Sequence, residues 1–271
     1  MKLLDCTIRD GGYYNSWDFP RELVDEYLAA MVGAGVDVVE LGFRSLKNEG
    51  FLGPYAFTTD DHLATLAVPK ELTLGVMVNA GELVRDQDQA ELMGRLFPNQ
   101  ASDSRVELVR IACHGHEFMR ALPAVQWVSQ RGYCVGINLI QVADRSKDEI
   151  AKLARAACDY PLEVLYFADS MGSMTPDQTH DTVVAFRQGW SGAMGVHTHD
   201  NMGLSLQNTL GALEAGVSWV DATVTGMGRG PGNTRMEELA FEVAERDARR
   251  SNLTPLMGVI RRHFRPLQQR H

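Results

Sequence analysis

The sequence predicts an α/β protein built as one closed barrel of eight strands and about eight helices. Two observations predict this fold class. Short β-rich runs alternate with longer amphipathic stretches along the chain, and eight such runs can be counted. The length of 271 residues also suits this fold, because (β/α)8 barrels commonly use about 250 residues as a single domain.

The predicted strands are short runs rich in β-branched and aromatic residues. In chain order they cover residues 3–8, 36–43, 72–79, 106–113, 133–141, 162–169, 193–199 and 219–226. Between them, apolar residues at helical spacing predict helices, several of which follow a Ser, Thr, Asp or Asn suited to capping. These helices cover residues 21–35, 82–97, 116–131, 146–158, 175–187, 202–215 and 234–248.

The barrel domain is expected to span residues 1–250. Residues 251–271 are expected to form a C-terminal amphipathic helical tail, which is too short for another domain. An open doubly wound sheet is the alternative, but no Gly-x-Gly-x-x-Gly follows the first predicted strand. The prediction is therefore a single-domain TIM barrel.

Composition argues against several function classes. The net charge of −9, with acidic and basic residues interspersed, argues against nucleic-acid and membrane-surface partners. No apolar run reaches the roughly 18 residues of a membrane span, and "MKLLDCTIRD" is too polar for a signal peptide, so we expect a cytoplasmic protein. Four widely spaced cysteines without a Cys-x-x-Cys pair predict buried, reduced thiols.

Polar side chains concentrate where the predicted strands end. In (β/α)8 barrels the active site lies at the C-terminal ends of the strands and in the loops that follow them. The candidates at these positions are Arg9, Asp10, Glu40, Arg44, Asn79, His114, Asn138, Gln141, Asp169, Ser170, His197, His199 and the loop 226–233.

The segment "HTHDNMG" (197–203) places two histidines two residues apart at the end of the seventh predicted strand. Residues i and i+2 of a strand point to the same face, so His197 and His199 can share one divalent metal ion. A His-x-His pair alone is weak evidence. However, Asp10 ends the first strand and Asn233 follows the eighth, and both strands lie near the seventh in a closed barrel. We therefore predict Asp10, His197 and His199 as metal ligands, with Asn233 as a candidate fourth.

Arg9 and Asp10 raise a question of side-chain direction. Alternating parity along a strand would put the two side chains on opposite faces. Both can reach the site only if the strand twists or turns there, which Gly11 and Gly12 make feasible.

The segment "CHGHE" repeats the His-x-His spacing at the end of the fourth predicted strand. Gly115 breaks that strand, so we expect His114 in the pocket and His116 at the start of the next helix. Two other strand-end residues also have a structural interpretation: Arg44 could simply be solvated, and Asp169 could shape a turn.

Six segments together resemble the DRE-TIM metallolyase superfamily, an HMG-CoA lyase-like group that includes 4-hydroxy-2-oxovalerate aldolase, HMG-CoA lyase and isopropylmalate synthase. The aldolase branch is the most similar, because "ADSMG" and "GMGRGPGN" match its segments best. In the family's order, the segments are "DCTIRDGG" (5–12), "VELGFR" (39–44), "RIACH" (110–114), "YFADSMG" (166–172), "HTHDNMG" (197–203) and "TGMGRGPGN" (225–233).

The resemblance implies site roles. Asp10, His197 and His199 would be the metal ligands, with Asn233 a fourth ligand or a neighbour. The metal would be Mn2+ or Mg2+, with Zn2+ or Co2+ as alternatives. Arg9 matches the arginine that stabilises an enolate, which suits an always-protonated donor.

The chain also departs from the family. The aldolase branch carries its general base four residues after the metal aspartate, where this chain has Tyr14, a poor base at its ordinary pKa near ~10. His114 is the substitute that we predict, with Tyr14 binding substrate or donating a proton. The chain also ends before the helical region by which that branch docks a dehydrogenase, so we expect no such partner.

The prediction is a metal-dependent carbon–carbon lyase that cleaves a 4-hydroxy-2-oxoacid to pyruvate and an aldehyde, or runs in reverse. The alternatives are an acyl-CoA-dependent Claisen condensation, a metallohydrolase and a non-catalytic binding barrel. The aldehyde, the native metal, the direction and the oligomeric state, including a homo-oligomer, stay open. Glu40 joins Arg9, His114 and Tyr14 as a predicted catalytic residue. The predicted substrate-binding residues are Gly11, Gly12, Arg44, Asn138, Asp169 and Ser170.

Overall fold

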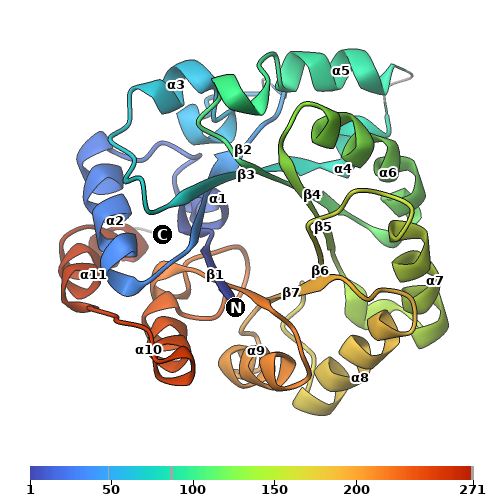
Figure 1. Ribbon diagram of the computed structural model, residues 1–271. Helices are drawn as coiled ribbons and strands as arrows, with labels where there is room; N and C mark the ends of the chain where they lie inside the picture. Colours follow the sequence, from blue (N-terminus) through green and yellow to red (C-terminus); the bar gives the residue numbers. More distant parts are fainter. Residues whose placement is uncertain (48, 86–87, 270–271) are drawn as a thin grey trace.

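The computed structural model describes residues 1–47, 49–85 and 88–269. Within these residues eight parallel strands close into a barrel in the order β1 to β8, with β8 pairing with β1, and helices surround the strands (Figure 1). This confirms the predicted TIM barrel. The strands are β1 Lys2–Asp5, β2 Val38–Phe43, β3 Thr73–Asn79, β4 Leu108–Cys113, β5 Cys134–Leu139, β6 Val164–Asp169, β7 Ala193–Thr198 and β8 Trp219–Ala222.

The helices begin and end where local sequence signals place them. The Ser146 and Glu149 pair forms a capping box at the start of α7, and Gly35 ends α2 in a left-handed conformation (φ 77°). The helices are α1 Thr7–Gly11, α2 Arg21–Ala34, α3 Asp60–Ala64, α4 Ala80–Leu83, α5 Gln89–Leu96, α6 Gly115–Gln130, α7 Lys147–Ala157, α8 Pro176–Arg187, α9 Ser205–Glu214, α10 Met236–Asp247, α11 Thr254–Val259 and α12 Arg265–Gln268.

Two predicted elements differ from the structure. The helix predicted at 82–97 is two helices, α4 and α5, because the Asp88 side chain accepts a hydrogen bond from the Glu91 N–H and so begins a new helix. Residues 86 and 87 of that prediction lie outside the described residues. The strand predicted at 219–226 ends earlier, at Ala222.

The strand predicted at 3–8 also ends early, and this change positions the site. The Asp5 carboxylate accepts a hydrogen bond from the Thr7 N–H (2.8 Å), and the Thr7 hydroxyl accepts one from the Val224 N–H (2.7 Å). These contacts turn the chain from β1 directly into the short helix α1. Arg9 and Asp10 therefore lie on a helix, where strand parity does not separate their side chains.

The segment after residue 250 packs against the first long helix. The Asn252 N–H donates to the Gly33 carbonyl (2.7 Å), and Phe264 contacts Tyr27 with ring centroids 6.1 Å apart. Figure 1 shows α11 beside α2 at the outside of the barrel. Between α11 and α12, residues Ile260–Phe264 form a π-helix.

Two simpler expectations can also be compared with the structure. Cys6 and Cys113 are buried, whereas Cys134 and Cys158 are exposed, so the prediction of four buried thiols is wrong for two of them. No helix within the described ranges is long and apolar enough to cross a bilayer.

Asp5 gives a prediction about stability. Its carboxylate is fully buried and accepts hydrogen bonds from Thr7 and from the Tyr27 hydroxyl, yet its Oδ2 has no partner. Burial raises the pKa of Asp5 from its ordinary value of 3.8 to about 6. Because the folded-state pKa is the higher one, folding favours the protonated acid. The stabilisation that results is fully present below the unfolded-state pKa and is lost as pH rises through about 6.

Asp5→Asn stays neutral at every pH and keeps one acceptor oxygen. We therefore expect its stability relative to the parent to be greatest at high pH. Its advantage in the free energy of unfolding should grow by roughly 1–2 kcal/mol between about pH 5 and about pH 8. Urea unfolding of both proteins at each pH measures this difference. A difference that does not vary with pH would show that Asp5 titrates normally in the folded protein.

Candidate active site and metal centre

Three side chains from opposite ends of the chain meet at the mouth of the barrel. Asp10 lies on α1, and His197 and His199 lie at the end of β7. Their ligand atoms all lie within 4.8 Å of one another, and the residues are 3%, 3% and 9% exposed. The predicted convergence is therefore present, and the three form a buried site that could hold a divalent metal ion.

The protonation states of Asp10 and His199 suit a cation. Burial alone would raise the pKa of Asp10, but the charge of Arg9 and the nearby imidazoles holds it below its ordinary value. Burial, with His197 next to it, lowers the pKa of His199 to about 4. An ionised carboxylate and a neutral imidazole, whose Nδ1 has no protein partner, are the forms that bind metal.

Asn233 lies beside this site as predicted, but its amide nitrogen faces the carboxylate. Its Nδ2 donates to Oδ2 of Asp10 at 2.5 Å, and its buried Oδ1 has no partner. Asn233 thus orients Asp10, and its free oxygen is the atom that could serve as a further ligand.

Asp10 and His197 also belong to a closed ring of buried polar side chains inside the barrel. Nη1 of Arg9 lies 3.0 Å from Asp10, and Nε of Arg9 donates to Glu40 at 2.7 Å. Glu40 also accepts from Nε and Nη2 of Arg110, on β4, at 2.6 and 2.9 Å. Arg9 and Arg110 therefore share one carboxylate, which fixes both guanidinium groups.

The other half of the ring returns to the histidine. Arg110 donates through Nη1 to Asp221 on β8 (2.7 Å), and Asp221 lies 3.3 Å from Nδ1 of His197. Nε2 of His197 is 3.7 Å from Asp10 and closes the ring. A carboxylate behind a metal-binding imidazole fixes the ring orientation and directs the other nitrogen to the metal. We call Asp10, Arg9, Glu40, Arg110, Asp221 and His197 the buried ring.

Small residues make space for this ring. A Cβ at Gly195 would lie 2.4 Å from the Tyr166 ring, and one at Gly136 would lie 3.3 Å from Cγ of Arg110. Tyr166 stacks on the Arg110 guanidinium, which lies 4.6 Å from the centre of the aromatic ring. Gly195, two residues before His197, thus leaves room that the Tyr166 ring fills.

Arg110 and Asp221 are functional candidates that the strand-end rule misses, because both lie within their strands. Their signal in the sequence is a charged residue inside an apolar run, "VELVRIAC" and "WVDATVTG". A fully buried charge needs a partner of opposite sign, so each of these runs points to an internal ion pair.

The same contacts change the role predicted for Glu40. Both of its oxygens accept hydrogen bonds from arginines. Glu40 is fully buried and does not line the pocket at the mouth of the barrel, which we call the mouth pocket. Glu40 therefore positions Arg9 and is not a catalytic residue that touches substrate.

The mouth pocket lies directly over the three proposed ligands. Its volume is about 450 Å³, within the range of small-molecule sites. Arg9, Asp10, His197 and His199 line it, and the Nη2 of Arg9 has no protein partner. A permanently charged side chain thus lines the cavity beside the three proposed ligands.

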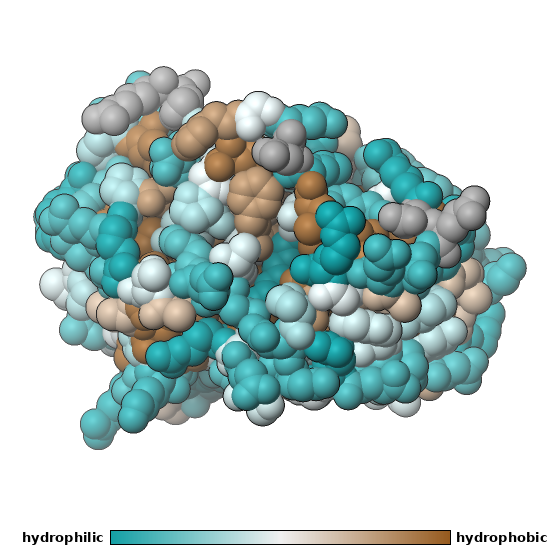
Figure 2. Space-filling view, turned by 90° about the horizontal axis from the view of Figure 1, so that it is seen from above, coloured by the Kyte–Doolittle hydropathy of each residue, from teal (hydrophilic) through white to brown (hydrophobic). Residues whose placement is uncertain are grey.

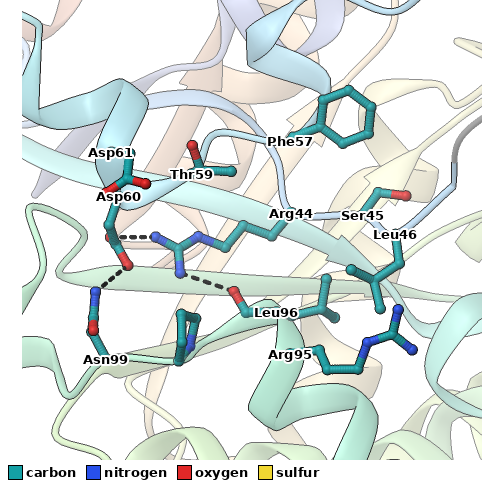
Figure 3. Close-up of a pocket in the computed structure, with 11 residues that line it drawn as sticks. Arg44, Ser45, Leu46, Phe57, Thr59, Asp60, Asp61, Arg95, Leu96 and Asn99 are labelled. Carbon is teal, nitrogen blue, oxygen red and sulfur yellow. Dashed lines mark hydrogen bonds and ion pairs between the residues drawn. The ribbon is translucent and has the colours of Figure 1, made fainter.

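Arg44, predicted to bind substrate, lies elsewhere. Its guanidinium binds Asp60 (2.6 Å) and the Leu96 carbonyl (3.0 Å), and it stacks on Phe97 at 4.8 Å. Figure 3 shows the contacts of Arg44 with Asp60 and Leu96 in a separate pocket, which shares no lining residue with the mouth pocket. This pocket lies between the segment after β2 and α5. Figure 2 views this side of the molecule, where apolar residues gather near the centre of a mostly hydrophilic surface. The prediction for Arg44 is therefore wrong.

The glycines and tyrosines after Asp10 also have other roles than the sequence predicts. Gly11 and Gly12 have ordinary helical φ values of −70° and −60° and do not line the pocket. A Cβ at Gly12 would lie 2.0 Å from the Trp17 ring, so this glycine serves close packing and not substrate binding. Tyr14 is half-buried against the core and does not line the pocket, whereas Tyr13 does. The predicted roles of Gly11, Gly12 and Tyr14 in contacting substrate are wrong.

Of the remaining single-residue candidates, the structure brings five to the pocket and one away from it. The five that line the cavity are Asn79, His114, Asn138, Gln141 and Ser170. Asp169 is buried outside it, and its carboxylate accepts from the Ser173 and Met174 N–H groups at 3.1 and 3.0 Å. Asp169 therefore shapes the loop after β6, the structural alternative that the sequence left open.

The two histidines after β4 follow the expected division. His114 is half-buried at the N-terminal cap of α6 and lines the pocket, while the His116 side chain is 75% exposed on the first turn of the helix. His114 is the one histidine of the described lining outside the proposed ligand pair.

Comparison with known proteins places this site in a family. The HMGL-like family model matches residues 1–259. The chain belongs to the HMGL-like family. Its relatives include carbon–carbon lyases and aldolases, so this HMGL-like chain is a carbon–carbon lyase by family membership.

Two curated relatives differ in their named reactions. The 4-hydroxy-2-oxovalerate aldolase of Pelotomaculum thermopropionicum is 30% identical over 243 residues, covering 88% of this HMGL-like chain and 68% of the relative. The oxaloacetate decarboxylase of Mycobacterium tuberculosis is 26% identical over 246 residues, covering 90% of this chain and 70% of the relative.

Solved structures agree on the HMGL-like barrel. The N-terminal domain of a candidate aldolase from Bacteroides vulgatus superposes with a TM-score of 0.90 at 29% identity, covering all of this chain and 88% of that one. The Bacillus subtilis HMG-CoA lyase has a TM-score of 0.75 at 15% identity, covering 98% and 93%, which supports the fold alone.

Proposed function

We propose that this protein cleaves 4-hydroxy-2-oxoacids to pyruvate and an aldehyde, or joins them, with a divalent metal held by Asp10, His197 and His199. The observation that carries the proposal is the convergence of Asp10, His197 and His199 at a pocket that Arg9 also lines. The relatives named 4-hydroxy-2-oxovalerate aldolase support the same reaction. Mn2+ or Mg2+ is the proposed ion, and Zn2+ and Co2+ are alternatives that suit imidazole ligands.

The residues divide the chemistry between them. A bound divalent cation would polarise the carboxylate and keto oxygens of the substrate. Arg9 donates to the oxygen on which negative charge develops, and Glu40 holds its guanidinium in that direction. Asn138 and Ser170 contact the substrate from the opposite wall of the pocket.

His114 is the proposed acid and base. It takes the proton of the 4-hydroxyl, the bond between C3 and C4 breaks, and the aldehyde forms while the electron pair moves into the pyruvate enolate. The proton then returns to C3 and gives pyruvate. Each step conserves atoms and charge, and no Schiff-base lysine is required.

The test is pyruvate release from 4-hydroxy-2-oxoacids of varied chain length, with Mn2+ supplied or removed by a chelator. We expect turnover only with metal. His197→Ala should lose most bound Mn2+ and most turnover together, measured by metal analysis of the purified protein and by coupled pyruvate detection. Full metal retention by His197→Ala would remove the proposed site. Release of free CoA from an acyl-CoA and a 2-oxoacid, with no aldol cleavage, would favour the Claisen condensation.

Oxaloacetate decarboxylation is a second candidate, favoured by the Mycobacterium tuberculosis relative and by the scarcity of bases in the pocket. Loss of the C4 carboxylate of oxaloacetate as CO2 also breaks the bond between C3 and C4 and leaves a pyruvate enolate, but no hydroxyl proton has to be removed first. His114→Asn is therefore expected to lower aldol cleavage by ~100-fold or more while changing decarboxylation by only a few-fold. Equal losses in both reactions would show that His114 is not the base specific to aldol cleavage.

A further inference from the structure

The mouth pocket has a charged half and a neutral half. Its charged lining residues, Arg9, Asp10 and Arg229, all come from the segments after β1 and β8, next to the two histidines of β7. The lining that β2 to β6 and their following loops contribute contains no Asp, Glu, Lys or Arg among the residues that the structure describes. The charges that can receive an anionic group are thus confined to one side.

This division determines how a substrate lies in the cavity. The carboxylate of a 2-oxoacid belongs on the charged side, with Arg9 and the metal ligands. The rest of the molecule then extends over the neutral side. A second carboxylate or a phosphate there would leave water without meeting a cation, which disfavours an anionic tail.

The neutral half is not simply apolar. Asn138 is 2% exposed and lines the cavity, and its amide oxygen has no hydrogen-bond partner. A buried acceptor of this kind needs a donor, and an alkyl chain supplies none. Asn79, Gln141 and Ser170 add further amide and hydroxyl groups to the same wall.

The backbone on this wall is held in a fixed and unusual form. Gln141 adopts a left-handed conformation (φ 55°), which is strained for a residue other than glycine, and its N–H donates to the Ser170 hydroxyl oxygen at 3.0 Å. The contact joins the segments after β5 and β6. The Ser170 hydroxyl is therefore held in place on this wall.

From this arrangement we infer that the aldehyde half of the substrate is uncharged and carries at least one hydroxyl group in addition to the 4-hydroxyl, as in a short sugar-like aldehyde. The inference rests on the proposed function and narrows its substrate class. The added hydroxyl donates to Oδ1 of Asn138, and the apolar side chains of Phe43 and Met77 in the same half cover the carbon chain.

The experiment is the Mn2+-dependent aldol addition of pyruvate to three aldehydes of equal chain length: glyceraldehyde, propanal and malonate semialdehyde. The kcat/KM for glyceraldehyde is expected to exceed both others by ~10-fold or more, because a site built to bind a hydroxyl rejects the analogue that lacks it. Equal or better use of propanal, or preference for the anionic semialdehyde, would overturn the inference.

Two matched variants locate the effect. Asn138→Leu should lower the ratio of kcat/KM for glyceraldehyde to that for propanal towards one. The control is Asn208→Leu on α9, where a buried asparagine has an unpartnered amide oxygen but does not line the pocket. Asn208→Leu should keep the parent ratio, and an unchanged ratio in Asn138→Leu would contradict the role of Asn138.

A separate measurement distinguishes this inference from the proposed function. Exchange of the pyruvate methyl protons with deuterated solvent reports enolate formation without any aldehyde. Exchange together with a preference for propanal would refute only the substrate class. Absence of exchange and of all aldol products would refute the proposed function and the substrate class with it.

Discussion

Arg9→Met is expected to lower the turnover of pyruvate chemistry by ~100- to 1,000-fold while the protein still binds Mn2+. The loss follows from removing a donor that is aimed at developing negative charge, an effect of this size in other enzymes. Arg9 lines the cavity, its buried Nη2 has no protein partner, and its Nε donates to Glu40. Proton exchange of pyruvate in deuterated solvent measures the turnover, and calorimetric titration measures metal binding.

Metal affinity gives this experiment its second readout. Arg9 lies 3.0 Å from Asp10, so its removal takes away a positive charge that competes with the cation. Mn2+ should therefore bind Arg9→Met at least as tightly as it binds the parent. Turnover within a few-fold of the parent would exclude Arg9 from stabilising the enolate. A loss of metal in step with activity would assign Arg9 to building the site and not to the reaction.

The sequence predicts the convergence of the three proposed ligands because their positions follow from topology alone. A closed parallel barrel brings the end of the first strand near the end of the seventh, and a His-x-His pair on a strand points to one face. Asp10, His197 and His199 therefore meet without any detail of packing being known. His114 and Asn138 lie at the mouth for the same reason.

Residues whose direction depends on packing are harder to predict. Arg44 follows β2 at the right height for a pocket residue, but Asp60 and the Leu96 carbonyl hold it outside the barrel. Tyr13 lines the pocket and Tyr14 does not, because the chain after β1 is helical, which no period-two pattern indicates. A search of strand ends could not find Arg110 as a partner of Glu40, because Arg110 lies within β4.

The buried ring leads to the second large effect, on Arg110. Its guanidinium joins Glu40, which holds Arg9, to Asp221, which lies behind His197. Arg110→Met leaves both carboxylates buried without their shared cation, so stability should fall by ~3–5 kcal/mol. With Asp221 and Glu40 no longer fixed, Mn2+ affinity should weaken by ~10- to 100-fold, as other proteins show when a group that orients a metal ligand is lost.

Arg44→Met is the control that separates this role from a structural one. Arg44 is also a buried arginine, paired with Asp60 at 2.6 Å and stacked on Phe97 at 4.8 Å, just as Arg110 is paired with Asp221 at 2.7 Å and stacked on Tyr166 at 4.6 Å. Both variants should unfold at lower urea concentration, but Arg44→Met should keep parental Mn2+ affinity. Arg110→Lys should restore part of the stability that Arg110→Met loses, but it should not restore the Mn2+ affinity. An ammonium group lacks the planar fork of N–H donors that binds two carboxylates. Equal Mn2+ affinities in the Arg110 and Arg44 variants would show that the ring stabilises the barrel without positioning the metal site.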